Sequence, residues 1–100
     1  MATTSTTVAC PAWCSPEHCT AHSLAPHAEH RSAPRYIRLD DGGAIAVSRV
    51  GYAGRARVEL AWWDPTQDLS DEPVEQVEIP AESLTAVVDE LAAARDDLLA

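Results

Sequence analysis

All three cysteines and all four histidines of this 100-residue chain lie between residues 10 and 30, in the stretch CPAWCSPEHCTAHSLAPHAEH. A chain of this length forms one small domain, whose hydrophobic core alone gives marginal stability, so a cross-link is expected to help. Clustered thiols and imidazoles can supply that cross-link either as a disulfide or as a bound metal ion. Whether the cysteines form a disulfide or bind a metal ion depends on whether the protein is in an oxidising or a reducing compartment.

The N-terminal sequence MATTSTTVAC has neither the basic region nor the apolar region of a secretory signal. No apolar run approaches the roughly 18 residues that are needed to cross a bilayer. We therefore expect a cytoplasmic protein without a membrane segment. Thiols stay reduced in the cytoplasm, where grouped Cys and His residues more often bind Zn²⁺ than form disulfides.

Four candidate ligands recur at intervals of four residues: Cys10, Cys14, His18 and His22. Pro16 disfavours a continuous helix through them, so we predict two tight turns, opened by Pro11 and Pro16, each with a ligand at its end. Two thiolates and two neutral imidazoles would make a tetrahedral, electrically neutral Zn²⁺ site. Cys10 and Cys14 are the natural thiolate pair.

The roles of the other residues in the cluster are not fixed by the spacing. Cys19 is a competing thiolate, a reactive thiol or a small buried residue, and His22 is the alternative imidazole ligand. His27 is expected to be solvated. Trp13 lies between the two thiolates, where it is predicted to pack over the site and exclude water.

Catalytic motifs are incomplete in this chain. Glu17 is adjacent to His18, which invites comparison with metallohydrolases whose Glu acts as general base, but neither HExxH nor the deaminase pattern is present. A catalytic zinc keeps one coordination position open, whereas this cluster has ligands to spare. We therefore expect no enzyme activity, and keep a zinc-dependent hydrolase with an open metal site as the alternative.

Beyond residue 34 the hydrophobic pattern predicts an α+β fold, with a small antiparallel sheet of three to four strands packed on one C-terminal helix. Residues 35–50 alternate around the turn sequence DGG and predict a hairpin. RARVELAWW at 55–63 predicts the clearest strand, and residues 74–80 predict a short fourth strand. From Pro80 onward, apolar residues recur at three- and four-residue steps and predict an amphipathic helix whose apolar face covers the sheet.

The chain accordingly divides into a disordered tail (1–9), an irregular zinc-binding segment (10–34) and a β-β-β-β-α core (35–100), within one domain. On strand 55–63, parity places Val58, Leu60 and Trp62 on the helix side and Trp63 on the other. We expect Trp63 to pack beneath the zinc-binding segment, near Trp13 or Leu24. The alternative is an indole exposed on a contact surface.

The net charge of −9 comes almost entirely from the last thirty residues, where nine acidic side chains accompany Arg95 alone. Such a surface repels phosphate backbones, which argues against nucleic-acid binding. We expect a protein partner of unknown identity, and the oligomeric state is left open.

The motifs CPAWC with His18, HRS at 30–32 and PAE at 80–82 resemble an actinobacterial family of domains of unknown function. That family opens with C-P-x-W-C-x₃-H, continues to a second His followed by x-S, and ends in strands and an Ala-rich helix. The resemblance implies four zinc ligands: Cys10, Cys14, His18 and His30. It implies no activity, so we expect a small zinc-stabilised domain that acts as a non-enzymatic protein-interaction or regulatory accessory module.

Overall fold

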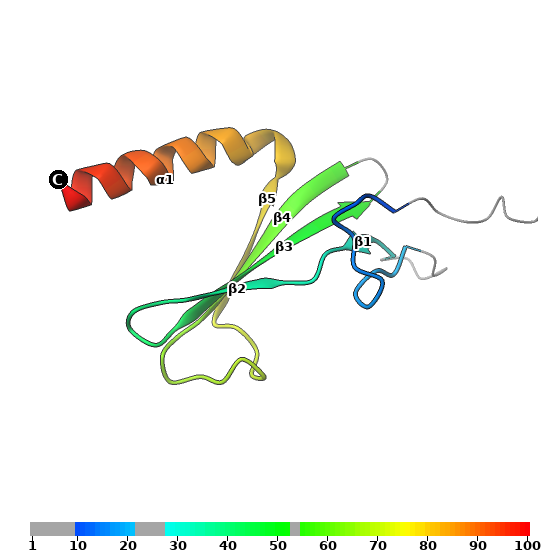
Figure 1. The fold of residues 1–100 in the computed structure, drawn as a ribbon, viewed down its shortest axis with the longest axis horizontal. Coiled ribbons are helices and arrows are strands. Elements are labelled where there is room, and N and C mark those ends of the chain that lie inside the picture. The colour runs from blue at the N-terminus through cyan, green and yellow to red at the C-terminus, as the bar shows by residue number, and fades with distance from the viewer. Residues whose placement is uncertain (1–9, 22–27, 53–54) are drawn as a thin grey trace, which may run out of the picture.

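The computed structural model describes residues 10–21, 28–52 and 55–100. Within them, one antiparallel sheet is followed by a C-terminal helix (Figure 1). The elements are β1 (His30–Arg31), β2 (Arg35–Arg38), β3 (Ala44–Tyr52), β4 (Arg55–Trp63), β5 (Glu75–Pro80), the 3₁₀ turn η2 (Ala81–Ser83) and α1 (Leu84–Leu99). The spatial order is β1-β3-β4-β5, and β2 also pairs with β3. The predicted α+β class is confirmed, with the cysteine and histidine segment preceding the sheet.

The turn between β2 and β3 forms where DGG predicted it. The Gly42 N–H donates to the carbonyl of Leu39 over 3.0 Å, and the Leu39 N–H donates to the carbonyl of Gly43 over 2.9 Å. Gly42 has a φ of 96°, which lies in the left-handed region that glycine adopts without steric cost. The hairpin therefore closes at the residue best suited to it.

The strand register divides the sheet into two faces of different character. Directly paired residues share a face, and β3 pairs with β4 from Ala44↔Trp63 to Tyr52↔Arg55. One face, called here the apolar sheet face, carries aliphatic and indole side chains from four strands: Ile37, Ile45, Val47, Val58, Leu60, Trp62, Val77 and Ile79. The predicted parity of β4 is thus confirmed.

Trp63 points to the opposite face, but the prediction that it docks under the zinc-binding segment is wrong. Its indole is only 7% exposed, its Nε1–H donates to the carbonyl of Asp71 over 2.9 Å, and it packs against Leu69. Its ring centroid lies 6.1 Å from that of Tyr36. The loop that follows β4 covers this indole, so Trp63 is also not an exposed contact residue.

Trp13, the expected neighbour of Trp63, lies at the other end of β3. A Cβ on Gly51 would be 3.3 Å from the Trp13 ring, whereas Trp63 is paired with Ala44. Seven residues of strand separate these two positions, or about 23 Å at the rise of a β-strand. Leu24 lies outside the described residues.

The helix begins later than predicted, because Pro80 is the last residue of β5 and η2 intervenes. Leu84, in the first turn of α1, lines a small pocket together with Trp13 and Val58. Beyond that turn, α1 diverges from the strands (Figure 1). The helix therefore packs on the sheet through its N-terminal end and not along its whole apolar face. The helices of the described residues fall short of the length and apolarity that spanning a bilayer requires.

Candidate metal site

Two consecutive turns shape the segment before the sheet, as predicted. In the first, the Cys14 N–H donates to the carbonyl of Pro11 over 3.0 Å. In the second, the carbonyl of Ser15 accepts from the N–H groups of both His18 (3.0 Å) and Cys19 (2.9 Å). The second turn therefore continues one residue past His18 and ends at Cys19.

Strand β1 fixes the position of His30 between the turns and the sheet. On one side, His30 pairs with Gly51 of β3. On the other side, the carbonyls of Glu29 and Arg31 accept hydrogen bonds from the N–H groups of Thr20 and Ser15, each over 2.9 Å. This two-residue strand is too short to show an alternating pattern, and it was not predicted.

An ion-pair network anchors β1 to the sheet on the face opposite His30. Arg31 donates to both carboxylate oxygens of Glu59, over 2.9 and 3.1 Å, and also to Glu29. Glu29 in turn pairs with Arg57 over 3.1 Å. Hydrogen bonding from Arg31 holds the pKa of the Glu59 carboxyl below its usual range, so this pair stays ionised at neutral pH. The bidentate geometry restricts the rotation of β1 about its axis.

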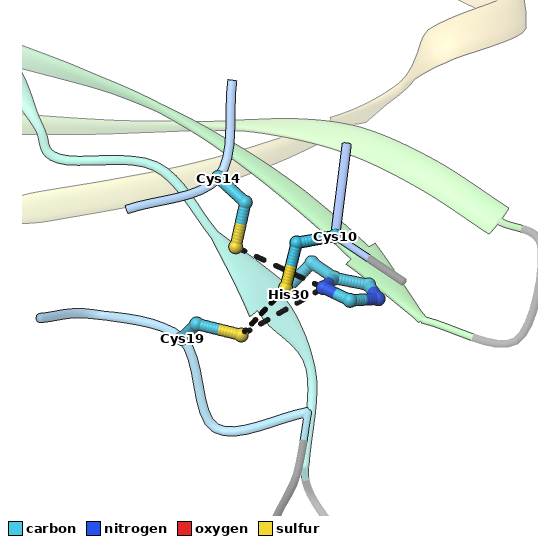
Figure 2. Close-up of side chains that lie close together, drawn as sticks. All are labelled: Cys10, Cys14, Cys19 and His30. Atoms are coloured by element: carbon cyan, nitrogen blue, oxygen red, sulfur yellow. Dashed lines mark hydrogen bonds between the residues drawn. The ribbon is translucent and has the colours of Figure 1, made fainter. Parts of the chain in front are cut away.

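Four potential ligand atoms converge beside β1: Cys10 Sγ, Cys14 Sγ, Cys19 Sγ and His30 Nδ1 (Figure 2). All four lie within 4.8 Å of one another. His30 Nδ1 is 3.8 Å from Cys14 Sγ and 3.7 Å from Cys19 Sγ, and the Sγ atoms of Cys10 and Cys19 are 4.0 Å apart. Residues from both turns and from the sheet therefore surround one small volume, which could hold a metal ion.

These separations match the edges of a zinc coordination tetrahedron. Zn–S bonds of about 2.3 Å and Zn–N bonds of about 2.0–2.1 Å give S···S edges of about 3.8 Å and S···N edges of about 3.6 Å. Three of the six separations, Cys10–Cys19, Cys14–His30 and Cys19–His30, exceed those edges by a few tenths of an ångström at most. All six lie within 4.8 Å. The donor set also suits zinc, because three thiolates and one imidazole form one of its common structural sites.

The structure brings together three of the four predicted ligands, Cys10, Cys14 and His30, and places Cys19 in the fourth position. His18 is outside this group, with its Nδ1 3.1 Å from the hydroxyl oxygen of Ser15. The prediction assumed that the second turn ends at its fourth residue, whereas its last hydrogen bond reaches the fifth. The alternative ligand His22, and also His27, lie outside the described residues.

Cys19 has an environment that favours its thiolate form. The N–H of Ala21 donates to Cys19 Sγ over 3.4 Å, and this hydrogen bond is the main cause of a lowered Cys19 pKa. Desolvation, together with the neighbouring thiols of Cys14 and Cys19, raises the pKa of Cys10 to about 11. Three thiolates cannot share so small a volume without a compensating charge, and a divalent cation would supply it.

The three cysteines are free thiols in the structure. The Sγ atoms of Cys10 and Cys19 are 4.0 Å apart, about twice the roughly 2.05 Å of a sulfur–sulfur bond. The imidazole of His30 would also be left with no role in a disulfide. A metal ion could engage all four groups.

Trp13 connects the cluster to the sheet. It lies within the first turn, and its ring packs over Gly51, the β3 partner of His30. A side chain on Gly51 would approach the ring atoms to 3.3 and 3.5 Å, so glycine leaves room for the indole. Trp13 also lines the pocket that includes Leu84. One indole therefore joins the cysteine turns, β3 and the start of α1.

Comparison with family models, with curated proteins and with solved structures finds no match for this chain. The resemblance to an actinobacterial domain family stays a prediction. The geometry of the four side chains is therefore the basis for any functional assignment.

Proposed function

We propose that this chain is a structural zinc domain in which Cys10, Cys14, Cys19 and His30 bind one Zn²⁺ ion. The observation that supports this proposal is that four ligand atoms of suitable chemistry lie within 4.8 Å of one another. Four protein ligands complete a tetrahedral shell, which is typical of structural zinc and leaves no position for substrate or water. A bound Zn²⁺ ion would cross-link the two turns to β1 and act as a Lewis acid toward its four protein ligands alone.

The location of the cluster supports a stabilising role. Residues 10–21 contain few aliphatic side chains, and they reach the sheet through backbone hydrogen bonds to β1 and through Trp13. A small domain gains much of its local order from a metal when it cannot bury enough apolar surface. Three thiolates with Zn²⁺ carry a net charge of −1, instead of the neutral site expected from two cysteines and two histidines.

We further propose that the domain acts by contacting a protein and not by catalysis. Support comes from apolar side chains that are more than half exposed on both the helix and the sheet, including Val77, Val88 and Leu91. Contiguous apolar surface on a small domain is typical of an interaction site. The acidic C-terminal segment argues against a nucleic-acid partner.

Metal analysis of the purified protein tests this function. Protein produced in zinc-supplied cells is expected to contain about one equivalent of zinc per chain, because a complete four-ligand site retains the ion. In the cobalt-substituted protein, added azide or cyanide should leave the visible absorption spectrum unchanged, since the coordination shell is full. Protein without bound metal would contradict the zinc site, and a spectrum that shifts with added anion would favour a hydrolase with an open position.

A further inference from the structure

Two exposed arginines line one hollow beside the cysteine turns. Arg35 of β2 and Arg49 of β3 border an open hollow with a volume of about 490 Å³, together with Trp13, Ser15 and Ser32. This volume lies within the range of about 300–1,000 Å³ that is typical of small-molecule sites. We call this space the arginine hollow.

The strand register places the two arginines on the same side of the sheet. Arg35 pairs with Val47, and Arg49 lies two residues farther along β3 on the same face. Diagonal neighbours of this kind on adjacent strands are about 7–8 Å apart between their Cα atoms. Two long side chains at this separation can reach the oxygen atoms of one bound anion.

The two guanidinium groups have no carboxylate partner within the part of the chain that the structure describes. The ion pairs there involve three other arginines: Arg31, Arg57 and Arg95. Acidic residues outnumber basic residues by 16 to 7 in the sequence, so carboxylates are plentiful. Two adjacent arginines that face one hollow without a counter-charge favour an anionic ligand.

The acidic residues of the sheet lie elsewhere. Glu59 and Glu78 pair with each other on the opposite face. Glu75 shares the face of the arginines, but it pairs with Trp62, four residues along β4 from the partner of Arg49, and it lines a different hollow. Among the described residues, no carboxylate lines the arginine hollow.

The charge and the lining of the hollow indicate the class of anion. A phosphate monoester carries a charge of about −1.5 to −2 at pH 7, which matches two guanidinium groups better than the single charge of a carboxylate. Arginine also binds phosphate oxygens through two parallel N–H groups. Trp13 supplies apolar surface, because its indole lines both this hollow and the adjoining pocket that contains Val58 and Leu84.

We propose that the arginine hollow binds a small phosphate monoester, with its phosphate between Arg35 and Arg49 and its organic group against Trp13. The acidic C-terminal segment disfavours a long polyanion, so the ligand is a single phosphate group and not a nucleic acid. This inference goes beyond the proposed zinc domain, because it uses none of the four residues of the metal cluster.

Titration of phenyl phosphate into the zinc-loaded full chain, followed by nuclear magnetic resonance, tests the site. The indole N–H of Trp13 and the guanidinium N–H groups of Arg35 and Arg49 should shift saturably, with a dissociation constant below about 1 mM. The indole of Trp63 is the internal control, since it is buried at the other end of β3 and donates to Asp71. Benzoate, which has the same ring and one charge, should bind at least about fivefold more weakly.

Arginine variants test the two cationic contacts separately. Arg35→Gln and Arg49→Gln should each weaken the binding of phenyl phosphate by at least about 10-fold, the loss expected for one charge-assisted hydrogen bond. Arg38→Gln is the matched control, because Arg38 is an exposed residue of the same strand as Arg35 on the opposite face, and this variant should bind unchanged. An unshifted Trp63 indole resonance shows that each variant keeps its fold.

Several results would overturn the site: no saturable shift up to about 10 mM phenyl phosphate, equal losses in all three variants, or equally tight binding of benzoate. Zinc loss from Arg49→Gln without phosphate binding would also overturn it, and would show that the arginines offset the negative charge of the metal centre. A zinc-containing chain that does not bind phosphate would leave the metal site standing.

The source of the phosphate is tested with a phosphotyrosine pentapeptide, which presents the same aryl phosphate on a peptide. Equal affinity for the peptide and for phenyl phosphate supports a free small ester as the ligand. Tighter binding of the peptide supports the same phosphate site and assigns the ester to a phosphorylated protein.

Discussion

Replacing Cys19 with serine is expected to weaken zinc binding by at least about 100-fold, even though its neighbour His18 fits the sequence spacing better. The hydroxyl of serine is a poor zinc ligand at neutral pH. Losing the Cys19 thiolate should therefore reduce zinc affinity by more than the roughly 10- to 100-fold that follows the removal of an outer-shell partner. The reason is geometric, since Cys19 Sγ lies 3.7 Å from His30 Nδ1 and accepts the Ala21 N–H. Competition titration with a chromophoric chelator measures the change in affinity.

His18→Ala is the matched control for Cys19→Ser, because it alters the adjacent residue in the same turn. Its imidazole Nδ1 lies 3.1 Å from the Ser15 hydroxyl oxygen and is not in the cluster, so the variant should bind zinc within about threefold of the unmodified protein. A larger loss in His18→Ala than in Cys19→Ser would show that the turn ends at residue 18 when the metal is bound, and would restore the predicted ligand set.

Removing zinc with a strong chelator is expected to unfold residues 10–21 and 28–34 while β2–β5 and α1 keep their structure. Structural zinc sites contribute an apparent binding free energy of about 10–16 kcal/mol at neutral pH, and in this chain that energy holds the turns and β1. The main sheet has a separate basis for its order, because β3 pairs with β4 along nine residues and Trp63 packs with Leu69 and Tyr36.

Amide hydrogen exchange of the chelated and zinc-loaded proteins measures this difference by residue. The amides of Cys14, Cys19 and Ser32 should lose protection by several orders of magnitude, and those in the centre of β3 and β4 should change little. Uniform loss of protection through β4 would contradict the claim that the main sheet is stable without zinc. Zinc would then be a requirement for the whole fold. Unchanged protection in residues 10–21 would mean that backbone hydrogen bonds and the packing of Trp13 keep this segment folded without zinc.

The sheet could be predicted because its strands have a two-residue period and its first hairpin has a recognisable turn. Val58, Leu60 and Trp62 occupy every second position of β4. DGG supplies a residue that accepts positive φ, so periodicity and turn chemistry agree. Strand β1 could not be predicted in this way, because two residues define no period. It forms only because the Ser15 and Thr20 amides and β3 supply hydrogen bonds on both sides.

Sequence patterns do not predict which distant segment covers Trp63 or at which residue the second turn ends. Trp63 was correctly placed on the face away from Trp62, but the loop that reaches it through the Asp71 carbonyl follows no pattern visible in the sequence. The structure brings Cys19 and not His18 beside the other three side chains, because a turn that closes on its fifth residue looks the same in sequence as one that closes on its fourth. The sequence does contain a signal for Cys19, because it is a third thiol only five residues after Cys14.

X-ray absorption spectroscopy at the zinc edge of the purified protein tests the central claim most directly. The account predicts a first shell of three sulfur atoms at about 2.3 Å and one nitrogen atom at about 2.0–2.1 Å. A shell of two sulfur and two nitrogen atoms would contradict the assignment of Cys19, and a shell that includes an oxygen atom would contradict a closed structural site.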